Sequence, residues 1–212
     1  MQKLEQQRRE EQLKESCAPV AELNERQVRS QLASAIFNSD VARISEIFEY
    51  GNACIARPPD SMSTWLGEAI SQNCDIAILE KLLSEGCEPN DESKSGGSTP
   101  LEEAVAAENF PAIELLLEHG ADPNKGRPIV GAIHYEKSPA VQLKLLGILV
   151  AHGASLNQRF DLFGNAAERF TVLDWAELYG SSDEVLTYLK DKGAENEWSR
   201  AQLQQKQKNL KK

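Results

Sequence analysis

Residues 99–124 read TPLEEAVAAENFPAIELLLEHGADPN, and this stretch decides the fold. Thr99 can accept backbone N–H bonds at a helix start, and Pro100 suits the first helical position, where its missing N–H is harmless. Apolar residues such as Ile113 then recur at helical spacing up to Gly120. Gly120 falls where a helix ends in a left-handed residue, a conformation that glycine adopts without steric cost. The stretch therefore predicts two short helices followed by a turn.

The same pattern recurs along the chain. The glycines that end the predicted second helices are Gly51, Gly86, Gly120, Gly153 and Gly193. Their spacings of 35, 34, 33 and 40 residues indicate an array of similar units, with about seven extra residues in the last interval. The first helices of the units are expected to begin at Thr64, Thr99, Arg127 and Thr171.

These residues resemble the ankyrin repeat. Its signature T-P-L-H-x-A is met most closely by Thr99, Pro100, Leu101 and Ala104, with Glu102 in place of the histidine. The endings Gly-Ala-x-x-Asn at 120–124 and 153–157 match as well. The resemblance covers residues 28–196 in about five units. It implies an all-α solenoid of stacked helix pairs joined by hairpin fingers, with a concave face made by the fingers and first helices.

Three segments make up the predicted organisation. Residues 1–27 form a charged N-terminal helix or arm, residues 28–196 form the array, and residues 197–212 form a basic tail or capping helix. The expected units of the array are 28–58, 59–93, 94–126, 127–165 and 166–196. The first unit lacks a Thr-Pro start, so it is expected to act as the N-terminal cap, a role that terminal repeats usually take.

Charge narrows the choice of partner. The 212 residues carry 23 basic and 33 acidic groups, a formal charge of -10, which repels nucleic acid and anionic membranes at long range. Five basic residues and no acid follow position 199, so residues 1–199 hold 18 basic against 33 acidic groups, or -15. The apolar stretch 145–151 is far shorter than the roughly 20 residues of a membrane helix. We therefore expect no nucleic-acid partner, no membrane insertion, and a partner with a basic surface.

The cysteines and the N-terminus bear on the compartment. Cys17, Cys54, Cys74 and Cys87 form no C-x-x-C pair, so free thiols are expected, while one or two disulfides stay open. The first ten residues are charged and lack the apolar region of a secretory signal. Both features favour the cytoplasm. A periplasmic or secreted location stays open if the chain is a trimmed mature form.

Catalytic patterns are absent from the sequence. No G-x-S-x-G, H-E-x-x-H or phosphate-binding glycine motif occurs. His119 and His152 each precede a repeat glycine, where the end of a helix favours positive charge, so their place in the repeat explains them. We therefore expect no catalytic residue, no cofactor, no metal site and no enzyme activity.

The candidate functional residues are those of a partner surface. If the ankyrin alignment holds, the ends of the first helices face the concave side, and these positions hold His134 and Tyr135 in the fourth unit and Tyr179 in the fifth. Tyrosine is enriched at binding hot spots. Packing beneath the lengthened loops is the alternative. Asp91 and Glu92 form either a solvated face or a surface that steers a basic partner.

An insertion at 159–170 is the most distinctive stretch. Its candidate contact residues are Phe160, Asp161, Leu162 and Phe163. A large apolar side chain stabilises by about 1.5–3 kcal/mol when buried, so the insertion either folds back as a lid or docks on a partner. Trp65 replaces the proline of its motif and is either a core residue or a contact at the base of a finger. Trp198 is expected to cover the open C-terminal end.

These observations predict a non-catalytic module that binds another protein through its fingers and concave face. In one version the chain is an inhibitor or immunity-type protein that neutralises a toxin or enzyme. The alternative is an adaptor or scaffold subunit of a larger complex, which uses its terminal helices as a second contact. The sequence does not indicate an oligomeric state.

Overall fold

A computed structural model describes residues 24–49, 64–92, 97–134, 136–161 and 169–210. The chain forms two compact units, Met1–Pro100 and Leu101–Lys212. Most of the predicted N-terminal arm and the first repeat glycine, Gly51, lie outside the described residues.

The first unit contains two helix pairs in its described part. They are α2 (Glu25–Phe37) with α3 (Val41–Glu49), and α4 (Trp65–Ser71) with α5 (Ile76–Ser84). Side chains at the helix starts cap these helices, as Asn24 and Thr64 show. The side chain of Asn24 accepts from the N–H of Gln27, and that of Thr64 accepts from the N–H of Gly67. The second helices α3 and α5 pack against each other through buried apolar residues that include Ile44 and Ile78.

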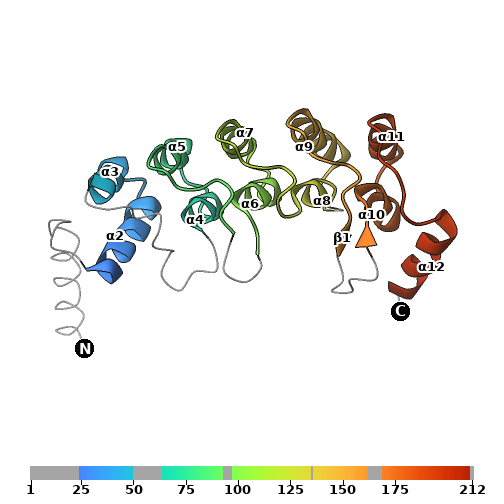
Figure 1. Ribbon diagram of the computed structural model, residues 1–212, viewed down its shortest axis with the longest axis horizontal. Coiled ribbons are helices and arrows are strands. Elements are labelled where there is room, and N and C mark those ends of the chain that lie inside the picture. Colours follow the sequence, from blue (N-terminus) through green and yellow to red (C-terminus); the bar gives the residue numbers. More distant parts are fainter. Residues whose placement is uncertain (1–23, 50–63, 93–96, 135, 162–168, 211–212) are drawn as a thin grey trace. The chain divides into compact units, whose positions relative to one another are not determined.

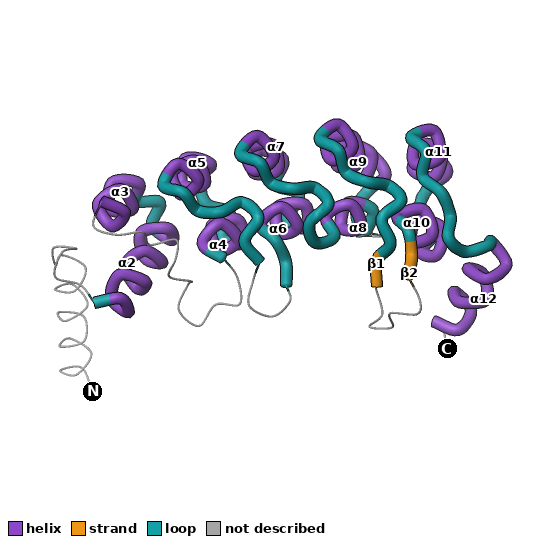
Figure 2. Tube along the Cα trace, viewed as in Figure 1, coloured by secondary structure: helices purple, strands orange, loops and turns teal. Residues whose placement is uncertain are grey.

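The second unit continues the same arrangement. Its helices are α6 (Pro100–Ala106), α7 (Phe110–Glu118), α8 (Pro128–Ala132), α9 (Pro139–Ala151), α10 (Val172–Tyr179), α11 (Asp183–Asp191) and α12 (Arg200–Leu210). The first helices α6, α8 and α10 lie in one row, and the second helices α7, α9 and α11 lie in another (Figures 1 and 2). Fully buried residues such as Leu101, Ile113 and Leu145 fill the space between the helices. The predicted all-α fold of stacked helix pairs is confirmed.

The turns that follow the second helices join neighbouring repeats. Gly86, Gly120, Gly153 and Gly193 have φ values of 88°, 86°, 91° and 85°, as the sequence predicts. Beyond the turn, the Asn124 amide donates to the carbonyl of Gly153 (3.0 Å) and accepts from the N–H of Ser155 (2.7 Å). Asn157 makes the same pair of bonds to Gly193 (3.0 Å) and Glu195 (2.8 Å). Each asparagine therefore ties its finger to the next.

Other predicted helix ends agree with the structure. Thr64, Arg127 and Thr171 precede the first residues of α4, α8 and α10, and α6 begins directly after Thr99. His119 and His152 are the C-cap residues of α7 and α9. The prediction that both histidines lie at the C-terminal end of a helix is confirmed. The insertion contains two short antiparallel strands, β1 (Phe160–Asp161) and β2 (Arg169–Phe170).

The cysteines differ from the expectation of free thiols. Cys87 is buried and disulfide-bonded, which corrects that expectation at one position. Cys74 is a free thiol that donates to the carbonyl of Ile36 (3.4 Å), and its pKa is raised by burial and by the nearby Glu68 carboxylate. Cys17 and Cys54 lie outside the described residues. The structure thus adopts the bridged alternative that the sequence left open.

The turns inside the helix pairs hold backbone strain. Among the described residues, Ser39, Asn73 and Glu108 adopt positive φ values of 55°, 53° and 55° without being glycine. Gly180 occupies this turn in the last pair, with φ of 73°. A left-handed non-glycine residue costs about 1–2 kcal/mol.

Ser39→Gly is therefore expected to raise the free energy of unfolding by about 0.5–1 kcal/mol. The gain is smaller than the strain because glycine adds freedom to the unfolded chain. Urea denaturation measures it. Gly180→Ser is the matched control. It is expected to lower stability because serine is strained at this positive φ, and no atom within 4 Å of an added Cβ offers a compensating contact. A destabilised Ser39→Gly variant would contradict the strain argument.

Candidate protein-binding surface

The loop between α8 and α9 is fixed to its surroundings by three side chains. The Lys137 ammonium donates to the carbonyl of Ala106 (3.1 Å) and pairs with the carboxylate of Glu108 (3.1 Å). The Lys137 side chain is only 8% exposed. From α9, the buried Gln142 donates to the carbonyl of His134 (3.0 Å). These bonds hold the loop at His134 and at Lys137.

The accessible side chains in the described part of this loop include those of His134 and Glu136. The side chain of His134 is 42% exposed and that of Glu136 is 71% exposed, with 3.8 Å between Nδ1 and Oε2. The loop therefore combines a clamped backbone with an accessible imidazole and carboxylate. A rigid backbone lowers the entropy that a surface loses on binding, which is what a protein-recognition site needs.

An aromatic pair lies at the end of α10. The rings of Trp175 and Tyr179 are 4.2 Å apart between centroids, with 39° between their planes, and both side chains are half-buried. Tyr179 also packs against the buried cluster of Phe170, Leu178 and Leu203. The packing alternative thus accounts for part of the Tyr179 side chain. Sequence reasoning missed Trp175, although its spacing of four residues from Tyr179 on a predicted helix was a usable signal.

The base of the long finger is folded back on the protein. Phe160 and Phe170 are 4% and 0% exposed and lie opposite each other in the two strands. Phe160 is therefore a core residue, which corrects its prediction as a partner contact. Asp161 is exposed and lies opposite Arg169.

The remaining predicted residues fall in different places. Trp65 is 3% exposed and belongs to the core of the first unit, so the core interpretation holds for it. Asp91 is partly exposed and Glu92 is exposed, in the segment that follows α5. Tyr135, Leu162 and Phe163 lie outside the described residues, and their roles stay predictions.

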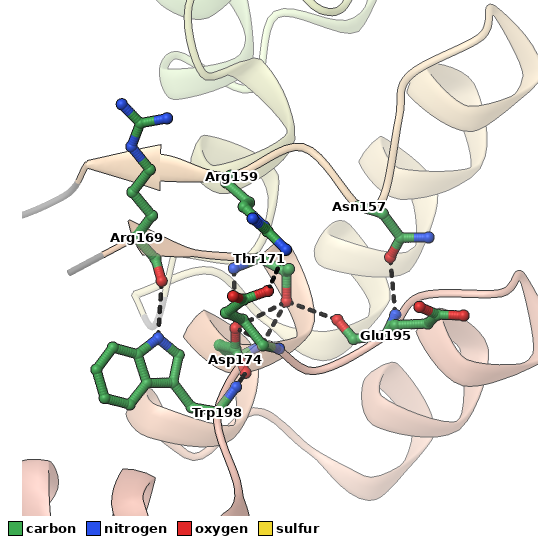
Figure 3. Close-up of polar contacts among 8 residues, drawn as sticks. Asn157, Arg159, Arg169, Thr171, Asp174, Glu195 and Trp198 are labelled. Atoms are coloured by element: carbon green, nitrogen blue, oxygen red, sulfur yellow. Dashed lines mark hydrogen bonds and ion pairs between the residues drawn. The ribbon is translucent and has the colours of Figure 1, made fainter. Parts of the chain in front are cut away.

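A buried carboxylate organises the C-terminal end of the array (Figure 3). Asp174, in the first turn of α10, is fully buried. Its oxygens accept from the backbone N–H groups of Thr171 (3.0 Å), Glu197 (3.0 Å) and Trp198 (3.1 Å), and from the side-chain amide of Asn196 (3.1 Å). With the Thr171 hydroxyl (3.0 Å), five donors satisfy this carboxylate, so it acts as a structural clamp between α10 and the chain that follows the last repeat.

Glu102 fills the equivalent position in the third repeat, where the ankyrin signature has histidine. Its carboxylate accepts from the N–H of Arg127 (2.8 Å). A Cβ built on Gly126 would lie 2.1 Å from a Glu102 oxygen, so the finger passes directly over this side chain. In both repeats an acid at this position fastens a later segment of the backbone.

The described residues provide no arrangement for metal chemistry. Within them, no group of three or more His, Cys, Asp or Glu side chains is placed to hold a metal ion. The same residues include no helix that is long and apolar enough to cross a membrane.

Repeated helix pairs, left-handed glycines and asparagine bridges define a class of repeat proteins that bind other proteins. Residues 96–126 match the family model described as Ankyrin repeat, so the chain carries an ankyrin repeat. The chain is also similar to 2-5A-dependent ribonuclease of Homo sapiens, 44% identical over 52 residues, which are 24% of this chain and 7% of that protein. The ribonuclease of Mus musculus is 39% identical over 54 residues, 26% of this chain and again 7% of that protein.

Asp174→Ala is expected to lower the free energy of unfolding by about 2–4 kcal/mol, because it leaves buried donors without an acceptor. Chemical denaturation followed by tryptophan fluorescence measures this loss. Asp183→Ala, at an exposed aspartate in the first turn of α11, is the control, with an expected loss under about 1 kcal/mol. Equal losses in the two variants would refute the clamp.

Proposed function

We propose that this chain is a non-catalytic module that binds another protein through the exposed side of repeats three to five. Ankyrin repeats are protein–protein interaction modules that carry no catalytic groups of their own. The observation that supports the site is the clamped loop, in which Lys137 and Gln142 hold the backbone while His134 and Glu136 stay accessible. Tyr135, which follows His134 in the sequence, and the half-buried side chains of Trp175 and Tyr179 extend the proposed surface.

The partner is proposed to carry a basic surface. The chain has a formal charge of -10, and Glu136 and Asp161 are exposed acids within the second unit. Opposite charge steers association and sets specificity more than it adds affinity. Leu162 and Phe163, which follow β1 in the sequence, and Asp91 and Glu92 in the first unit are proposed as further contacts.

In its sharper form the proposal is an inhibitor or immunity-type protein that covers the active surface of a basic toxin or enzyme. The alternative is an adaptor in a larger complex that uses a terminal helix as a second contact. The exposed Lys208 on α12, in a segment without acids after position 199, supports the adaptor. The similarity to the ribonucleases covers 7% of their length, so we propose no ribonuclease activity for this chain.

The test compares two double variants that remove the same residue types. His134→Ser with Glu136→Ser changes the proposed surface, and Glu118→Ser with His119→Ser changes exposed residues at the end of α7. The partner is captured from a lysate of the native source, purified, and titrated against both variants. We expect about tenfold or greater loss of affinity for the first variant only, since hot-spot residues dominate binding energy.

Equal affinities of the two variants would contradict the proposed surface. Loss of the partner's own activity on binding would identify an inhibitor. For an adaptor we expect a different result. Lys208→Glu would weaken the binding of one partner, whereas the double change at His134 and Glu136 would not.

The disulfide bears on the compartment. Disulfides persist in oxidising environments, so the bond at Cys87 supports the periplasmic or secreted alternative over the cytoplasm. Protein from the native source, denatured without reductant, is expected to show two reactive thiols, and four after reduction. Four reactive thiols before reduction would overturn this proposal.

A further inference from the structure

Trp198 precedes α12 and covers β2, the second strand of the insertion at 159–170, which is called the finger below. Its ring stacks on Phe170 with 5.5 Å between centroids and 16° between planes. Its indole N–H donates to the carbonyl of Arg169 at 2.7 Å (Figure 3). The Trp198 side chain thus contacts both residues of β2. The backbone N–H of Trp198 donates to the Asp174 carboxylate (3.1 Å).

The helix α12 adds two contacts to the same place. The Lys206 ammonium lies 4.4 Å from the ring centroid of Trp198 and 5.6 Å from that of Phe170. Leu203 is 3% exposed and belongs to the cluster with Phe170 and Leu178. A cation over an aromatic face is attracted by its quadrupole, so Lys206 strengthens the stack beneath it.

The attachment of α12 rests on few side chains. Among its described side chains Leu203 is buried, Lys206 is half-buried, and Gln202, Gln204, Gln205 and Lys208 are exposed. A helix at the end of an array that is held by few of its described side chains belongs to the part of a fold that opens before the core does. Opening of α12 would change the surface that covers β2.

We propose that α12 is a positioning element for the strands β1 and β2, and that its docking and the pairing of these two strands are energetically coupled. A molecule that draws α12 away from α10 loosens the two strands. By linkage, a molecule that binds the ordered finger strengthens the docking of α12 by the same factor. The link between this coupling and binding rests on the proposed function, whereas the coupling itself is a property of the free protein.

Because of this coupling, truncation of the C-terminal segment does not distinguish the inhibitor from the adaptor. Removing the C-terminal segment does not only delete a second contact of an adaptor. It also uncovers Phe170 and frees the finger, so an inhibitor that uses the finger would lose affinity as well. Single substitutions on the exposed side of α12, such as Lys208→Glu, avoid this ambiguity.

Hydrogen exchange of the free full-length protein tests the coupling. Leu203→Ala is expected to raise exchange at the amides of Phe160, Asp161 and Phe170 about tenfold or more, while the Leu116 amide in α7 keeps its wild-type rate. Lys206→Gln is expected to raise the finger rates about threefold or more. Lys206→Arg is expected to restore them because it keeps the charge, and Lys208→Gln to leave them unchanged.

Two results would overturn the proposal. In the first, α12 amides exchange faster in Leu203→Ala while the finger amides keep their wild-type rates. In the second, the Leu116 amide accelerates as much as the finger, which means that the variant lowers global stability without local coupling. Neither outcome depends on a partner, so failure here is distinguishable from failure of the proposed function.

Discussion

A helix pair of this length cannot bury its own apolar faces, so every pair in the chain depends on a neighbour. Residues such as Ile113 and Leu145 are fully buried because helices of neighbouring pairs cover them. The asparagine of each finger adds polar bonds to that contact, as Asn124 does with Gly153 and Ser155. Stability is thus local and additive along each unit, and the pair of α10 and α11 is followed by α12 in place of a further helix pair within the described residues.

The C-terminal end solves this problem with departures from the repeat. Asp174 replaces the signature histidine and gathers the backbone of residues 197 and 198, which places Trp198 on Phe170. The loop with His134 is a second departure, held by a lysine whose partner, Glu108, adopts a left-handed conformation. At Asp174, hydrogen bonds to the following segment offset the cost of burying a charge. At Glu108, the ion pair with Lys137 offsets the strain of a left-handed residue. The proposed function depends on these departures, since a regular repeat names no partner.

The sequence predicted the helix pairs and their ends because these follow from local chemistry: a left-handed turn selects glycine, as at Gly120, and helix faces repeat at fixed spacing. It did not predict which aromatic side chains are buried. Phe160 is covered in a hairpin with Phe170, and Trp198 reaches that hairpin from another segment. Likewise, the role of Asp174 depends on donors more than twenty residues away, which no spacing rule connects. The sequence alone therefore did not predict the long-range contacts of the insertion.

On this account a partner docks on the exposed side of repeats three to five. Hydrogen exchange of the chain, alone and in complex with its purified partner, tests this claim most directly. The account predicts slower exchange in the complex over residues 133–138 and 175–179, with α2 to α5 unchanged. Slower exchange confined to α12 or to the first unit would contradict it.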